Sequence, residues 1–119
     1  MSAARPPDGQ DRFPGYDVLS QAPNWDDTTA ELVLARLEPP APLRFFRPAE
    51  AATASALFDQ LLHQRQEPRV PVLSMVDARL ADGETDGWRY DDMPEDAEAF
   101  RMSLAGLDAD AKEAGAGAF

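Results

Sequence analysis

The stretch Leu43–Leu62, LRFFRPAEAATASALFDQLL, decides the fold that we predict for this chain. Pro48 suits the first position of a helix, because its missing N–H would have no intrahelical partner there. Glu50 then places a negative charge near the positive end of the helix dipole. Beyond it, apolar residues recur at the spacing of one buried helix face: Ala51, Ala54, Leu57, Phe58, Leu61 and Leu62. The stretch therefore predicts an amphipathic helix that ends near Gln64.

Three further helices are predicted around this one. The first runs to about Leu37 from a cap at either Asn24 or Asp26, and Pro39-Pro40 stops it. A shorter helix spans roughly 71–81, with Gly83 as its terminator, and the last begins near residues 95–97 and ends at Gly115. No stretch alternates polar and apolar residues for long enough to form a strand. The prediction is an all-α fold, a small bundle of about four helices with an irregular N-terminal arm.

A chain of 119 residues supports one domain with a modest core. We expect residues 1–11 to form a flexible tail and residues 12–119 to form a single helical domain. Residues 12–25 are expected to be an irregular arm, because turn residues such as Pro14-Gly15 interrupt them. The aromatic residues of this arm must pack against the chain's own helices or another subunit, and they are Phe13, Tyr16 and Trp25.

Composition narrows the classes of partner and chemistry. The net charge of −11, from 22 acidic and 11 basic residues, argues against nucleic acid and anionic membranes as partners, since both repel such a surface. The sequence has no cysteine, which removes disulfides, thiolate zinc sites and iron–sulfur clusters. We see no Sec or Tat signal and no apolar run long enough to span a bilayer. The expectation is a cytoplasmic protein without direct membrane insertion.

Candidate chemistry is sparse. His63 is the only histidine, four residues after Asp59, but no G-x-S-x-G nucleophile motif accompanies the pair. The acidic run that begins at Asp82 places Gly87 at the sixth position of a calcium loop, yet Met93 occupies the twelfth, where a glutamate is required. A solvated loop is the favoured interpretation. We predict no catalytic, cofactor-binding or metal-binding residue in this chain.

One segment has the composition of a contact surface. Trp88-Arg89-Tyr90 stands in the middle of the acidic loop, and these three residue types are over-represented at interface hot spots. The alternative is that both aromatic rings pack on the chain's own helices while Arg89 pairs with a neighbouring aspartate. With the arm and the aromatic pair before Pro48, the predicted partner-binding residues are Phe13, Tyr16, Trp25, Phe45, Phe46, Trp88, Arg89 and Tyr90.

Four segments follow one another in a recognisable order. Residues 46–51 read FRPAEA, residues 76–80 read VDARL, an acidic linker with Tyr90 and Pro94 follows, and residues 100–108 read FRMSLAGLD. In this order and spacing, residues 43–119 resemble the gluconate 2-dehydrogenase subunit 3 family. The sequence departs from that family in lacking twin arginines and in carrying Arg47 where a Thr or Ser cap is usual. Losing such a cap costs a helix about 0.5–2 kcal/mol unless another group replaces it. It also ends at Phe119, where relatives usually continue, so we expect a shortened member or an incomplete chain.

The resemblance implies a small helical subunit without a cofactor of its own. Its partner would be the large subunit of a flavin-dependent dehydrogenase of the glucose-methanol-choline (GMC) type, which carries the FAD and the catalytic base. In membrane-bound relatives a cytochrome subunit completes the complex. We therefore expect a non-catalytic subunit that binds and stabilises a flavin-dependent sugar or alcohol dehydrogenase. The second hypothesis is a free-standing acidic helical adaptor for a basic protein surface, and an independent enzyme ranks third.

Overall fold

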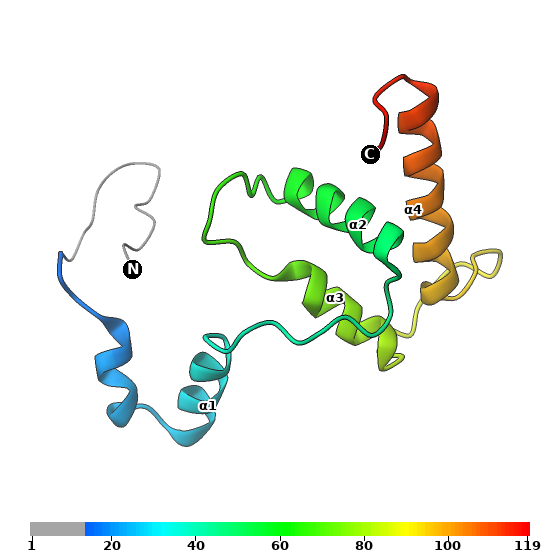
Figure 1. The fold of residues 1–119 in the computed structure, drawn as a ribbon. Coiled ribbons are helices and arrows are strands. Elements are labelled where there is room, and N and C mark those ends of the chain that lie inside the picture. The colour runs from blue at the N-terminus through cyan, green and yellow to red at the C-terminus, as the bar shows by residue number, and fades with distance from the viewer. Residues whose placement is uncertain (1–13) are drawn as a thin grey trace. The chain divides into compact units, whose positions relative to one another are not determined.

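The computed structural model describes residues 14–119, and this part of the chain is all-helical (Figure 1). Its elements are the 3₁₀-helix η1 (Val18–Asn24) and the α-helices α1 (Asp27–Ala35), α2 (Pro48–Leu61), α3 (Val72–Ala81) and α4 (Asp96–Glu113). The predicted all-α class is confirmed, and the four predicted helices correspond to α1–α4. The fifth element, η1, was not predicted. Among the described residues, no helix has both the length and the apolar character needed to cross a membrane.

The chain divides into two units between Pro40 and Ala41. In the N-terminal unit, the arm that we expected to be irregular contains η1, so that prediction is wrong for its C-terminal half. The reason is local, because the Asp17 carboxylate accepts the N–H of Leu19 at 3.0 Å and the Asp17 carbonyl accepts the N–H of Ser20 at 3.1 Å. Asp26, rather than Asn24, caps α1 by accepting the N–H of Thr29 at 2.8 Å. No residue of η1 or α1 is buried. The predicted tail, residues 1–11, and Phe13 lie outside the described residues.

The second unit, residues 41–119, is built around α2, which contacts both α3 and α4 (Figure 1). Three residues form its buried core: Phe46 before α2, Ala54 on α2 and Leu104 on α4. Partly buried apolar residues surround these three, namely Phe45, Ala51, Leu57, Phe58, Leu73, Val76, Leu80 and Phe100. The core thus joins three helices and the extended segment that leads into them.

The predicted apolar face of α2 is only partly covered. Its first three turns pack inward, but Leu61 is 72% exposed and Leu62 is 51% exposed, so the prediction is wrong for the last turn. The helix ends at Leu61 because His63 takes a left-handed conformation with φ of 54°, and the N–H of Gln64 returns to the carbonyl of Asp59 at 2.9 Å. The residues of the core described above include none between Phe58 on α2 and Leu73 on α3. By contrast, Gly83 has positive φ just after α3, as predicted, and Gly115 has positive φ just after α4.

Candidate partner-binding surface

A buried carboxylate on α3 holds the segment that precedes α2. Asp77 is only 1% exposed, and it accepts three backbone N–H groups, from Arg44 at 2.7 Å, from Phe45 at 2.9 Å and from Phe46 at 2.8 Å. Burial raises the pKa of Asp77, but the three N–H donors outweigh it, so the net pKa lies below its ordinary value. Asp77 therefore stays ionised at neutral pH and binds three consecutive backbone amides of the segment that precedes α2.

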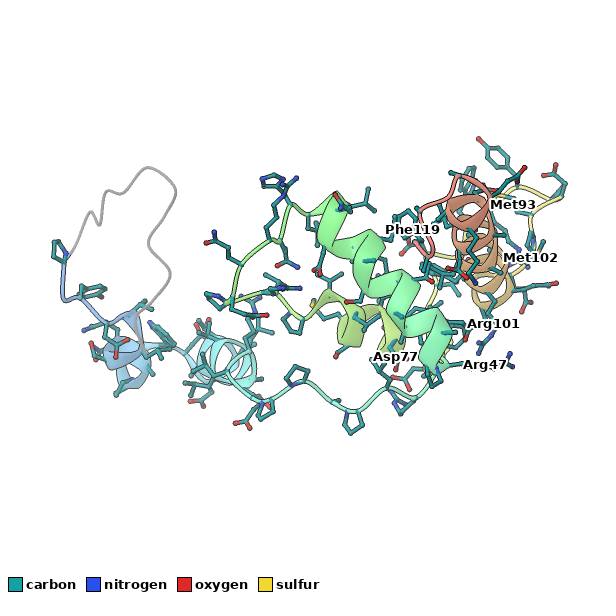
Figure 2. All side chains as sticks on the ribbon, turned by 45° about the horizontal axis from the view of Figure 1, so that its top comes forward. Arg47, Asp77, Met93, Arg101, Met102 and Phe119 are labelled. Atoms are coloured by element: carbon teal, nitrogen blue, oxygen red, sulfur yellow. The ribbon has the colours of Figure 1, made fainter. Side chains whose placement is uncertain are left out.

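An arginine on α4 holds the same segment from the other side. Arg101 pairs with the Glu50 carboxylate, donates to the carbonyl of Phe45 at 3.1 Å, and places its guanidinium carbon 4.1 Å from the centroid of the Phe45 ring. Figure 2 shows Asp77, Arg101 and Arg47 gathered around the N-terminal end of α2. We call Glu50, Asp77 and Arg101, which come from α2, α3 and α4, the anchor triad.

Glu50 supplies one of the two bonds of a capping box at the start of α2. Its carboxylate accepts the N–H of Arg47 at 2.9 Å, whereas the Arg47 side chain has no acceptor with which to return a bond. Burial raises the pKa of Glu50, but the bonds from Arg101 and from the Arg47 amide outweigh it and leave the net pKa low. Glu50 thus satisfies the amide of the N-cap residue, whereas the bond that a Thr or Ser side chain would accept from the first turn is not replaced, because the Arg47 side chain makes no cap bond.

The anchor triad holds the two aromatic residues before Pro48, and their side chains are covered to different degrees. Phe46 is 7% exposed and lies in the core, and Phe45 is half-buried against it with the rings 5.2 Å apart in an edge-to-face arrangement. Phe46 was among the predicted partner-binding residues, but the structure places its side chain in the core of this chain. The ring of Phe45 contacts the ring of Phe46 and lies beneath the guanidinium group of Arg101.

The anchor triad was not predicted, but one signal for it was visible. Asp77 shares a helical stripe with Leu73, Val76 and Leu80, since these positions are three or four residues apart. A carboxylate on an otherwise apolar helix face is buried and must be paired or hydrogen-bonded. No sequence signal identified its donors, which lie more than 30 residues earlier in the chain.

The aromatic residues of the acidic loop do not pack on the helices. Trp88 is 72% exposed and Tyr90 is 62% exposed, and their rings contact each other edge-to-face at 4.9 Å. Arg89 lies 3.8 Å from Glu95 rather than beside an aspartate. The alternative of internal packing is therefore wrong, and a partner contact at this loop stays a prediction.

The described residues of the arm differ in exposure. Tyr16 is 60% exposed, whereas Trp25 is half-buried directly after η1. Their role in binding a partner also stays a prediction.

Asp59 and His63 do not form the pair that their spacing would allow. Asp59 pairs with Arg69 at 2.7 Å, and His63 is exposed at the left-handed end of α2. Across residues 14–119, no three side chains of His, Asp or Glu gather in a way that could hold a metal ion. In the same range, every buried polar side-chain atom has a hydrogen-bond partner. The distinctive features of the second unit are thus its anchor triad and its exposed aromatic loop.

Comparison with known proteins places these features in a family. No curated protein matches this chain, and no solved structure matches it. A family model described as gluconate 2-dehydrogenase subunit 3 matches residues 48–119, which include α2, α3, α4 and the whole anchor triad. The match covers more than half of the sequence and agrees with the order of motifs noted above. The chain belongs to the gluconate 2-dehydrogenase subunit 3 family.

Proposed function

We propose that this chain is a non-catalytic accessory subunit that binds and stabilises a flavin-dependent sugar or alcohol dehydrogenase of the GMC type. The observation that carries the proposal is the family match across α2–α4. In this proposal the partner subunit supplies the FAD and the catalytic base, and this chain supplies a binding surface. A cytochrome subunit is a further candidate member of the complex.

The exposed aromatic pair supports a binding role. Burying an aromatic side chain removes about 150–250 Å² from water, at about 25 cal/mol per Å². Since Trp88 and Tyr90 are both mostly exposed, covering them would contribute on the order of 3 kcal/mol each, before the cost of association. That gain is large enough for these two rings to act as hot spots.

The anchor triad supports the same role indirectly. It ties α2, α3 and α4 to one extended segment, so the loop between α3 and α4 starts and ends on helices that are both held in place (Figures 1 and 2). A preorganised surface loses less conformational entropy on binding than a mobile one.

The test is a pull-down of the tagged chain from its native cell, followed by an absorbance spectrum of the purified material. We expect a yellow complex with flavin bands and a second, large chain. A colourless preparation would refute the proposal, and a colourless complex with a basic partner would favour the adaptor hypothesis.

The matched variants are Trp88→Ala/Tyr90→Ala and the control Met102→Ala. Met102 is 60% exposed on α4, so its truncation removes an exposed apolar side chain outside the loop (Figure 2). We expect the double variant to lose most of the flavoprotein and the control to retain it. Equal retention by both would place the interface elsewhere.

A further inference from the structure

Helix α1 and the turn that follows it carry an apolar stripe. Its four residues recur at the spacing of one helix face, and they are Ala30, Val33, Leu34 and Leu37. The winding continues past Ala35, since the N–H of Leu37 returns to the carbonyl of Leu34 at 3.0 Å. Ala30 and Val33 are half-buried, whereas Leu34 is 42% exposed and Leu37 is 60% exposed. We call Leu34 and Leu37 the α1 leucine pair.

The length of α1 makes this exposure significant for its stability. The helix has nine residues, and none of them is buried. Isolated helices shorter than about 12–15 residues are marginal in water, because most helical stability in proteins comes from packing of an apolar face. A surface that covers the leucine pair would therefore stabilise α1.

Acidic side chains lie beside the leucine pair. Leu34 follows Glu31 by three residues and precedes Glu38 by four, which are the spacings of neighbours on a helix. Both glutamates are exposed, and neither forms an ion pair within residues 14–119. The helix dipole favours Asp27 in the first turn, but it disfavours Glu38 at the opposite end. The stability of α1 itself therefore does not explain Glu38.

The charge of the chain argues against occupants that are built from the same sequence. Residues 14–40 contain five acidic residues and one basic residue, and residues 41–119 contain 15 acidic and 8 basic residues. A second copy carries a net charge of −11. Like charges across an interface disfavour association, whereas opposite charges guide it. The complementary surface is an apolar groove with basic side chains at its rim, on a different polypeptide.

We infer that α1 docks through its leucine pair into an apolar groove of the flavoprotein, whose rim places Lys or Arg beside Glu31 and Glu38. An amphipathic helix that lays its apolar face into a groove is a common mode of peptide recognition. The family match begins at residue 48, so this contact lies outside the matched region and adds to the one proposed at Trp88 and Tyr90. The inference rests on the proposed function, because it takes the groove to belong to that partner.

Amide hydrogen exchange of the whole chain, alone and in the purified flavoprotein complex, tests the inference. In the isolated chain we expect the amides of residues 31–38 to exchange almost as fast as in an unfolded peptide, because a helix with few buried contacts opens at little cost in free energy. In the complex they should exchange more slowly by about ten-fold or more, since opening then requires release of the groove. The amides of α2 should be protected in both samples and serve as the reference.

Three outcomes of the exchange experiment would overturn the inference. Residues 31–38 that are already protected in the isolated chain at every concentration would show that the chain covers its own leucine pair. Protection that rises with the concentration of the isolated chain would assign the face to a second copy. Unchanged exchange in the complex would show that the flavoprotein does not contact α1.

Matched leucine variants test the apolar half of the contact. Leu34→Gln/Leu37→Gln changes the leucine pair, and the control Leu61→Gln/Leu62→Gln changes two leucines that are 72% and 51% exposed at the end of α2. Affinity is measured for the flavoprotein that the wild-type chain retains. Two leucines that bury part of their surface predict about a 100-fold loss for the α1 variant and less than about a three-fold loss for the control. Equal affinities for the two variants would overturn the inference.

Matched charge variants test the basic rim. Glu31→Gln/Glu38→Gln removes two charges beside the leucine pair, and Asp110→Asn/Glu113→Gln removes two near the end of α4. At about 50 mM salt we expect the first variant to associate about three-fold more slowly than the second, and the difference should shrink at about 300 mM, where exposed charges are screened. Equal association rates at low salt would show that only net charge matters, and the inference would fail.

The pull-down separates failure of this inference from failure of the proposed function. If the wild-type chain and the Leu34→Gln/Leu37→Gln variant retain the flavoprotein equally, the docking of α1 is refuted and the proposed function stands. If the wild-type chain retains no flavoprotein, the proposed function is refuted, and the inference that rests on it fails as well.

Discussion

Replacement of Asp77 by Asn is the sharpest test of how this fold is held together. The two carboxylate oxygens of Asp77 accept different numbers of hydrogen bonds. One oxygen accepts the N–H groups of Phe45 and Phe46, and the other accepts the N–H of Arg44. An Asn side chain of the same shape has one oxygen and one NH₂ group. If the amide oxygen keeps the two phenylalanine N–H groups, its NH₂ group faces the N–H of Arg44, which is a donor opposite a donor.

The expected magnitude follows from those contacts. Asp77→Asn loses one hydrogen bond outright and the charge assistance of the other two, and bonds to charged groups contribute about 1.5–3 kcal/mol each. Arg44 is exposed, so its amide can turn to water and recover part of the loss. We expect the free energy of unfolding to fall by about 2 kcal/mol. For Asp77→Ala, which orphans all three donors, we expect a fall of about 3–5 kcal/mol, a large share of the 5–15 kcal/mol of a typical domain.

The assay is urea unfolding at pH 7, followed by circular dichroism, with Asp92→Asn as the control. Asp92 is exposed and has no ion pair within the described residues, so its replacement should change the free energy of unfolding by less than about 0.5 kcal/mol. If Asp77→Asn were as stable as this control, the three amides would not depend on the carboxylate, and the reasoning about the anchor triad would be wrong.

Three further predictions concern the anchor triad and the aromatic loop. Arg101→Met removes the bonds to Glu50 and to the carbonyl of Phe45; we expect a loss of about 2 kcal/mol, seen as a fall in Tm of roughly 8–16 °C, and an unchanged Tm would contradict it. Folding lowers the pKa values of Glu50 and Asp77, so the unfolded chain binds protons more readily. The stabilisation from these two carboxylates should be fully present above about pH 5 and should be lost as the pH falls through the lowered pKa values. If the free energy of unfolding from urea titrations did not change between neutral and acid pH, this linkage would be excluded. Trp88→Ala/Tyr90→Ala should leave the free energy of unfolding within about 0.5 kcal/mol of wild type, because both rings are mostly exposed; a loss above about 1 kcal/mol would mean that they act in packing.

Local sequence determined the helices of this protein. The apolar period, Pro48 at a helix start and Gly83 and Gly115 at helix ends predicted α2, α3 and α4, because these signals act within one or two turns of chain. The order of four short motifs was also sufficient to indicate the family that the match over residues 48–119 then showed. A 3₁₀-helix in the arm was missed because its stabilising bonds, at Asp17, follow no strong periodic pattern.

Only the tertiary structure decided which residues are covered and which remain available to a partner. Phe46 is buried and Trp88 is exposed, although each is an aromatic residue directly followed by an arginine in the sequence. The difference arises from contacts between distant segments: Asp77 reaches back to the amides of residues 44–46, and Arg101 reaches the carbonyl of Phe45. Periodicity specifies the face of a helix but not the segment that will cover it, because that depends on how α2, α3 and α4 pack together.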